Sequence, residues 1–273
     1  MVDILWSMMQ RKKRFFSSTV QSQPTGLTNS FLLRMIKSAR FLSVIFLTLS
    51  FPVWASDLRN KEEPLEYYRK ERASDYEYAI KTSKEIYTEL SNQGYPYAVE
   101  AASIVFPELL RYHEFQNDIE SLFNELLAIT SEESDGFSIG PMQMKPVFAV
   151  QVEKIIALNS VYRQRYSSIN YNGDTSTVDA RRKRLVRLNN LTLQMEYLKA
   201  FMDWEIEVLG LRSEDRETRI MYLSAAYNFG IQESREKLKG LFNMETFPSG
   251  KRRLYFNYQK ICLAAALKLT EEK

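Results

Sequence analysis

One glutamate in the sequence lies where a carboxyl group could work as a general acid. Glu108 stands among apolar residues in the segment 105–110, which reads Val-Phe-Pro-Glu-Leu-Leu. Burial disfavours the charged form of a carboxyl group, so it would raise the pKa of Glu108 and let the side chain hold a proton. The alternative is a glutamate that points into solvent, as most glutamates do.

Composition leaves few other routes to chemistry. The chain has one His and one Cys among its 273 residues. A single Cys cannot form an internal disulfide, and one His with one Cys cannot build a zinc site of the usual nitrogen and sulfur type. A Ser-His-Asp mechanism would depend on His113 alone. We therefore expect no metal and no cofactor, and chemistry that depends on carboxylates, tyrosines or backbone groups.

A second segment, residues 137–146, combines turn formers with polar side chains. It reads Phe-Ser-Ile-Gly-Pro-Met-Gln-Met-Lys-Pro, and its Gly and Pro predict a turn that leads into a helix. From that turn Ser138, Met142 and Gln143 would project from a fixed place, and Gln143 could hydrogen-bond a neutral ligand such as a sugar amide. The alternative is a plain junction whose methionines fill the core.

A third segment, residues 225–230, places two polar side chains at a helix end. It reads Ala-Ala-Tyr-Asn-Phe-Gly, in which the alanines permit close packing and Gly230 can end the helix. Tyr227 and Asn228 would then lie at the terminus with their polar ends free. An ordinary helix C-cap would show the same residues.

In this order the three segments resemble the lytic transglycosylase family with a lysozyme-like, SLT-type domain, over about residues 97–265. The run Ser138 to Gln143 is similar to the family's S…G-L-M-Q segment, and the run Ala226 to Gly230 to its A-Y-N-A-G segment. Asn257-Tyr258 looks like its late N-Y-V segment, with Tyr255 as a rival. The resemblance implies an all-α, lysozyme-like fold and peptidoglycan strands as the partner. It implies Glu108 as the catalytic residue and a substrate-binding set of Ser138, Met142, Gln143, Tyr227, Asn228 and Tyr258.

The position of the catalytic glutamate departs from the family pattern. The family has Ser directly after its Glu, whereas Leu109 follows Glu108, 35 positions before Gln143. Glu133-Ser134 supplies such a pair, but only 10 positions before Gln143 and in a polar loop. A proton donor needs a dry and rigid setting, so we favour Glu108 and keep Glu133 as the rival. An inserted helix over 117–129 would explain the longer gap.

The reaction that the resemblance implies needs a single carboxyl group. As an acid it protonates the glycosidic oxygen between N-acetylmuramic acid and N-acetylglucosamine. As a base it then takes a proton from the muramoyl 6-hydroxyl, which closes a 1,6-anhydro ring. If Asp135 held a water opposite Glu108, the outcome would be lysozyme-like hydrolysis instead. The alternative function is a non-catalytic envelope protein that uses the same fold to bind glycan or a partner protein.

The elements that must position these residues are nearly all helical. Helical composition and capping signals predict a single all-α domain. Pro107 should break or kink the buried helix that begins at Tyr97, so that Glu108 closes this helix, and Ser213 should cap a later one. A long loop is expected over 159–179. The expected helical ranges are 63–93, 97–106, 117–129, 141–158, 180–209, 213–230, 233–241 and 251–269.

The first 55 residues have the composition of a leader. Residues 35–55 hold a short basic stretch, an 11-residue apolar run and the small-x-small end Val53-Trp54-Ala55, the order of a secretory signal peptide. The apolar run is too short to span a bilayer, which takes about 17 to 25 residues. We interpret 1–34 as an upstream over-call or disordered segment, 56–94 as a helical extension and 95–273 as the transglycosylase domain. The protein should then be periplasmic or secreted.

Removing the leader reverses the sign of the net charge. The whole chain carries +3, but residues 1–55 hold seven basic residues and one acidic residue. The remaining 218 residues carry 30 basic and 33 acidic side chains, a net charge of −3. The basic excess belongs to the leader, so the composition gives no support to a nucleic-acid-binding function. The mature chain also shows no transmembrane segment.

Overall fold

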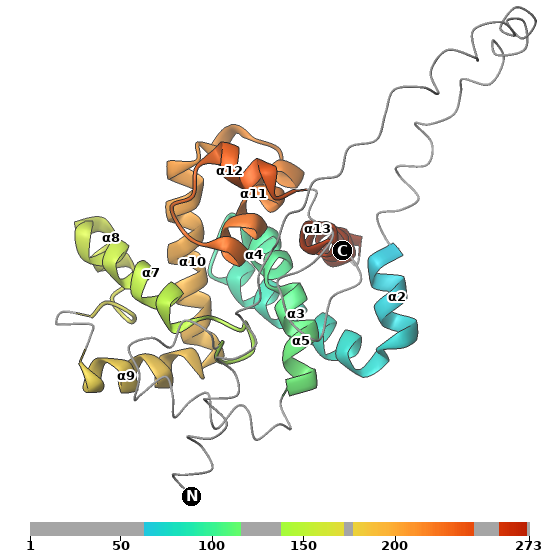
Figure 1. Ribbon diagram of the computed structural model, residues 1–273, viewed down its shortest axis with the longest axis horizontal. Coiled ribbons are helices and arrows are strands. Elements are labelled where there is room, and N and C mark those ends of the chain that lie inside the picture. Colours follow the sequence, from blue (N-terminus) through green and yellow to red (C-terminus); the bar gives the residue numbers. More distant parts are fainter. Residues whose placement is uncertain (1–62, 116–137, 172–176, 243–256, 272–273) are drawn as a thin grey trace, which may run out of the picture. The chain divides into compact units, whose positions relative to one another are not determined.

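The computed structural model describes residues 63–115, 138–171, 177–242 and 257–271, and these are helical with no strand (Figure 1). This confirms the expected all-α class. In chain order the helices are α2 (Glu63–Glu71), α3 (Ala73–Asn92), α4 (Ala98–Ile104), α5 (Phe106–Phe115), α7 (Pro146–Leu158), α8 (Ser160–Arg165), α9 (Val178–Leu188), α10 (Leu191–Val208), the 3₁₀ turn η1 (Leu211–Ser213), α11 (Arg216–Phe229), α12 (Arg235–Gly240) and α13 (Tyr258–Glu271).

Helix α4 is the centre of the core. All seven of its residues are buried, and it packs against α3, α11 and α13. Glu100 is the one charged residue in it, and its carboxylate lies 2.8 Å from the Arg219 guanidinium of α11. Pairing and hydrogen bonding are what make a buried charge tolerable. The apolar composition of α4 therefore predicts its central place correctly.

Capping residues divide the chain into more helices than the sequence pattern predicts. The range 180–209, expected as one helix, is two helices, because the chain turns at Asn189 and the Asn190 side chain caps α10 by accepting from the Leu193 N–H at 3.0 Å. The expected loop 159–179 contains α8, which Asn159 caps. Asp215, and not Ser213, caps α11, with its carboxylate 2.8 Å from the Thr218 N–H.

Two buried carboxylates outside the three motifs have different surroundings. Glu153 of α7 is paired with Arg184 of α9 at 2.6 Å and accepts the Tyr197 hydroxyl of α10 at 2.6 Å. Glu205 of α10 is fully buried, and one of its oxygens accepts the Gln232 N–H at 3.0 Å. Its other oxygen has no partner within the described residues. Burial raises the pKa of Glu205 to about 7.

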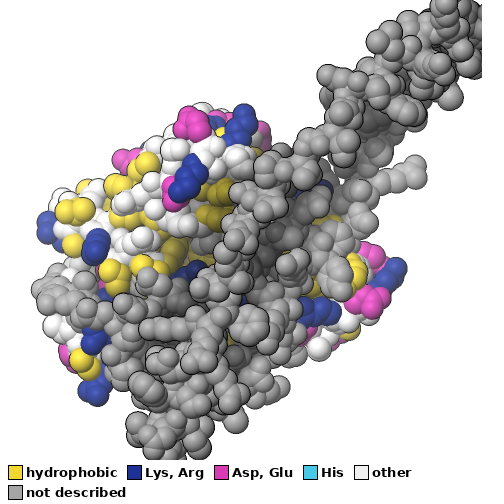
Figure 2. Space-filling view, viewed as in Figure 1, with side chains coloured by type: hydrophobic (Ala, Val, Ile, Leu, Met, Phe, Trp, Pro, Cys, Tyr) yellow, Lys and Arg dark blue, Asp and Glu magenta, His cyan; other side chains and the backbone are white. Residues whose placement is uncertain are grey.

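The described surface mixes the two signs of charge. On the visible face basic and acidic side chains are interspersed around hydrophobic ones, without a basic patch in the part that is described (Figure 2). In the described ranges no helix has both the length and the apolar character needed to cross a membrane.

Candidate functional site

Glu108 lies in the first turn of α5, directly after the buried α4. Its side chain is 6% exposed, and Phe106, Leu109 and Leu110 around it are fully buried. Pro107 fits here because the first turn of a helix does not use its N–H groups, and α4 ends just before it, as Pro107 predicts. Glu108 was expected to close a helix. It lies in the first turn of α5 instead, where the helix N-terminus carries a partial positive charge.

The surroundings of Glu108 bring its pKa close to neutrality. Burial raises this pKa from 4.5 to about 7. Arg111 and Lys145 act in the opposite direction, and the Arg111 guanidinium lies 3.2 Å from a Glu108 oxygen. Burial is the stronger effect because the side chain has almost no contact with water. A carboxyl group with such a pKa can both give and take a proton near pH 7.

Residues 138–145 form a tight loop rather than the start of a helix. Ile139 and Met144 exchange backbone hydrogen bonds of 2.9 and 3.1 Å, and Gly140 and Gln143 have positive φ values of 69° and 50°. The helix was expected from Pro141, but α7 begins at Pro146. The backbone pairing of Ile139 with Met144 closes the loop. A helix could not include Gly140 and Gln143, because both have positive φ values.

Gln194 of α10 fastens this loop to the core. This fully buried amide accepts the Met142 N–H at 3.1 Å and donates to the Ile139 carbonyl at 2.9 Å. Gly140 lies so close to the end of α9 that an added Cβ would come within 2.1 Å of the Leu188 carbonyl oxygen. Gln194 is not among the residues predicted from the sequence. Its only signal is an amide on the apolar face of an otherwise amphipathic helix.

Tyr227 connects the third motif to the second. At the last turn of α11 its hydroxyl donates to the Met142 carbonyl at 2.7 Å, and its ring lies edge-on to Phe148 and Phe201. Met142 itself is fully buried, so it offers the site a backbone carbonyl and not a side chain.

Tyr258 connects the last helix to the same place. Its hydroxyl donates to the Ile104 carbonyl at the end of α4, at 2.9 Å. Burial and then the negative charge of Glu108 raise the pKa values of Tyr258 and Tyr227 well above 10. The same two causes raise the pKa of the Cys262 thiol, which is buried. Both tyrosines therefore stay protonated as hydrogen-bond donors beside Glu108.

The structure thus brings Glu108 together with Tyr227, Tyr258 and the loop that carries Met142 and Lys145. Lys145 and Arg111 were missed by the sequence analysis, although Arg111 stands one helical turn after Glu108. The other three predicted residues, Ser138, Gln143 and Asn228, are partly exposed. Of these, the Gln143 amide donates to the Gly140 carbonyl at 3.1 Å, whereas the side chains of Ser138 and Asn228 make no hydrogen bond within the described residues.

Several predictions fall on residues outside the described ranges. These are the rival glutamate Glu133, Asp135, the helix over 117–129, Tyr255 and the whole leader. The backbone of His113 is described but its side chain is not.

Searches of family models, curated proteins and solved structures gave no match to this chain, so its resemblance to the transglycosylases depends on the motifs themselves.

Proposed function

We propose that this protein is a peptidoglycan-cleaving lytic transglycosylase in which Glu108 is the acid and the base. The observation that carries the proposal is the buried Glu108 carboxyl with its pKa of about 7, flanked by Tyr227 and Tyr258. The three motif segments, which are far apart in the sequence, supply the groups around it. This proximity is what the family resemblance requires, and it supports the proposal.

The proposed reaction uses each state of Glu108 once. The protonated carboxyl gives its proton to the glycosidic oxygen as the bond from that oxygen to the anomeric carbon of the muramoyl unit breaks. The resulting carboxylate then accepts the proton of the muramoyl 6-hydroxyl as its oxygen attacks the same carbon. This closes the 1,6-anhydro ring and restores the acid, so no water is consumed. Tyr227 and Tyr258 remain neutral and hold the surrounding backbone in place.

The test is product analysis on purified peptidoglycan. The full chain should release 1,6-anhydromuropeptides that mass spectrometry identifies, and Glu108→Gln should lower the rate by at least about 100-fold, since it removes the proton donor. Glu236→Gln, an exposed change on α12, is the matched control and should keep full activity. If Glu133→Gln abolishes release and Glu108→Gln does not, the acid is Glu133. Reducing-end products without the anhydro ring would indicate hydrolysis instead.

A second candidate function is glycan binding without cleavage. Two observations favour it: the Arg111 guanidinium 3.2 Å from Glu108, which stabilises the ionised form, and Leu109 in place of the family's Ser. In that case the protein would sediment with insoluble peptidoglycan, and no soluble muropeptide would appear even after prolonged incubation.

A further inference from the structure

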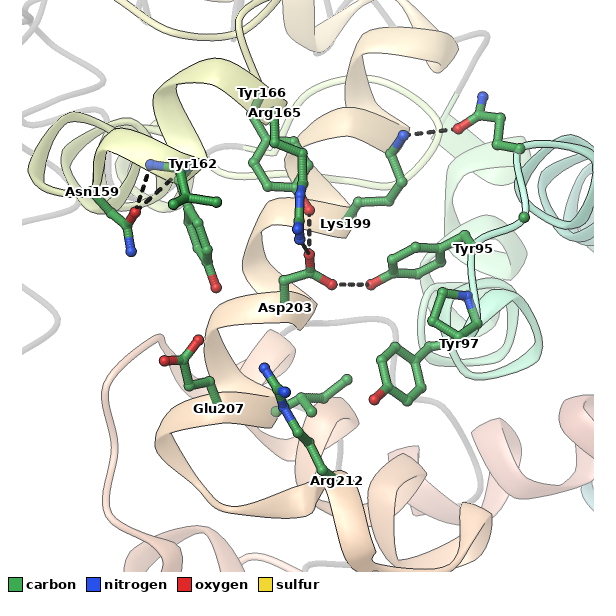
Figure 3. A pocket seen from close by; sticks show the side chains of 15 residues that line it. Tyr95, Tyr97, Asn159, Tyr162, Arg165, Tyr166, Lys199, Asp203, Glu207 and Arg212 are labelled. Carbon is green, nitrogen blue, oxygen red and sulfur yellow. Dashed lines mark hydrogen bonds and ion pairs between the residues drawn. The ribbon is translucent and has the colours of Figure 1, made fainter.

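A polar cavity lies at the other end of α4 from Glu108. It has a volume of about 690 Å³, within the range of about 300–1,000 Å³ that small-molecule sites occupy. Its walls come from the link between α3 and α4, from α8 and from α10, with η1 below them (Figure 3). None of the residues predicted for the transglycosylase site lines it.

One carboxylate fixes the two sides of this cavity. Asp203 of α10 accepts hydrogen bonds from the Tyr95 hydroxyl at 3.1 Å, the Tyr166 hydroxyl at 2.6 Å and the Arg165 guanidinium at 2.7 Å. Tyr95 stands before α4, whereas Arg165 and Tyr166 stand at the end of α8. Asp203 therefore holds two segments about 70 residues apart in the sequence against one helix, and its own charge is already paired.

Each side carries a pair of tyrosines packed edge to face. Tyr95 and Tyr97 form one pair, with centroids 5.9 Å apart, and Tyr162 and Tyr166 form the other, at 5.8 Å. In both pairs one hydroxyl is bound to Asp203. The hydroxyls of Tyr97 and Tyr162 have no hydrogen-bond partner within the described residues, although both tyrosines line the cavity.

Two further groups lie open at the same cavity, and their charges are opposite. Glu207 and Arg212 are exposed and have no ion-pair partner in the part of the chain that is described. In Figure 3 the Tyr162 ring and the Arg212 side chain extend toward each other across the cavity, with Glu207 to one side and Tyr97 to the other. The open groups thus comprise one guanidinium donor, one carboxylate acceptor and two hydroxyls that can both donate and accept. The charges of Glu207 and Arg212 cancel.

We propose that this cavity is a binding site for neutral sugar units of a glycan chain, separate from Glu108. A sugar hydroxyl both donates and accepts, which matches the open phenols, carboxylate and guanidinium. The C–H groups of a pyranose ring pack against aromatic surfaces, which the partly exposed rings of Tyr95 and Tyr97 provide, whereas the rings of Tyr162 and Tyr166 are buried.

Three cations and two carboxylates line the cavity, but Arg165 is paired with Asp203 and Lys199 with Glu196. One charge of each sign, Arg212 and Glu207, therefore stays open, which favours neither an anionic nor a cationic ligand. Because Asp203 already holds the walls in place, little ordering is left for binding to impose.

The position of the cavity gives it a use that the catalytic site alone does not supply. Its wall residues Tyr95 and Tyr97 precede α4, and Glu108 follows α4, so the same buried helix separates the two places. A chain held at the cavity would keep the protein on its polymer without occupying the acid. The inference needs no cleavage at Glu108, and it also holds if the protein only binds glycan.

Trp204 offers a direct readout of occupancy. Its indole lies edge-on to the Tyr162 ring with centroids 6.4 Å apart. The other two tryptophans, Trp6 and Trp54, lie in the leader and can be changed to Phe in the full chain. Titrating that variant with the tetramer of N-acetylglucosamine and with cellotetraose should change the Trp204 fluorescence, and calorimetry on the unmodified full chain should give the same dissociation constants.

Single-group variants decide whether the cavity is the site. Tyr162→Phe and Arg212→Ala should each weaken binding of the tetrasaccharide about three- to tenfold, the usual effect of one lost hydrogen bond. Tyr171→Phe and Arg182→Ala, which lie outside the cavity, are the matched controls and should change nothing. Because Tyr162→Phe keeps the ring and Arg212 is exposed, both variants should fold, and circular dichroism checks this.

Two outcomes would overturn the proposal. One is the absence of binding to both tetrasaccharides at millimolar concentration, and the other is binding that neither Tyr162→Phe nor Arg212→Ala weakens. Glu108→Gln separates this inference from the proposed function, because it should abolish anhydromuropeptide release and leave the fluorescence titration unchanged. Loss of the fluorescence response in Glu108→Gln would assign the sugar to the catalytic site and reject a second one.

Discussion

At the scale of single residues, the proposed chemistry of Glu108 depends on the balance between burial and two nearby cations. Burial raises its pKa to about 7, whereas Arg111 and Lys145 lower it. A general acid must be protonated in the free enzyme, so kcat/KM for peptidoglycan cleavage should fall tenfold per pH unit above about pH 7. Arg111→Gln removes one opposing charge and should move the pH at which kcat/KM begins to fall to a higher value. If this pH is unchanged in Arg111→Gln, the result argues against Glu108 as the acid.

Gly140 is a second residue whose surroundings decide how much a substitution lowers the stability of the protein. Gly140→Ala should destabilise the protein by about 3 kcal/mol or more, because its Cβ would come within 2.1 Å of the Leu188 carbonyl at a φ of 69°. Gly210→Ala is the control, since Gly210 has a similar φ of 65° and open space around it. It should cost only about 1 kcal/mol. Urea unfolding measures both, and equal losses would mean that contact with Leu188 is unimportant.

At the scale of elements, α10 positions the candidate loop through one side chain. Gln194→Leu should cost about 1–3 kcal/mol, because it leaves the buried Met142 N–H without its partner, whereas the Ile139 carbonyl still accepts from the Met144 N–H. Gln164→Leu on the exposed face of α8 is the matched control and should stay within about 0.5 kcal/mol. Thermal unfolding compares them. Product release should also fall in Gln194→Leu, under conditions where circular dichroism shows the protein folded.

Local signals predicted most of the described helices but not α5 or α8, and they predicted the boundaries less well. The apolar run of α4 and the break at Pro107 follow from burial and from the missing proline N–H, both of which depend on neighbouring residues only. The split between α9 and α10 depends on which of two adjacent asparagines caps the next helix. The loop 138–145 depends on Gln194, more than 50 residues later. Such contacts leave no periodic signal in the sequence.

The candidate site could be predicted as a set of residues but not as an arrangement. The first and third motif segments led to Glu108 and Tyr227, the late segment of the family led to Tyr258, and the structure places these three together. The sequence could not show that Met142 contributes its carbonyl instead of its side chain, because that depends on the path of the loop. It also gave no reason to select Lys145, whose charge acts on Glu108 through space.

At the scale of the whole molecule, the leader predicts where the mature protein begins. If residues 35–55 are an export signal, expression of the full sequence in a bacterium with a periplasm should yield a chain that starts at Ser56. N-terminal sequencing of the periplasmic fraction measures this. Replacing Leu47 by Arg in the apolar run should retain the uncut chain inside the cell. A periplasmic chain that still begins at Met1 or Met35 would contradict the interpretation.

The buried Glu205, together with Glu108, affects how the stability of the whole protein depends on pH. Glu108 and Glu205 both have pKa values near 7 in the folded chain and about 4.5 when exposed. Between these values the native state binds more protons than the unfolded state, so these two groups lower stability as pH rises from about 4.5 to 7. Folding at about pH 6 should therefore take up about two protons at these carboxyls. A weakly buffered refolding experiment with an indicator dye would record that uptake as a rise in pH, and Glu205→Gln would halve it.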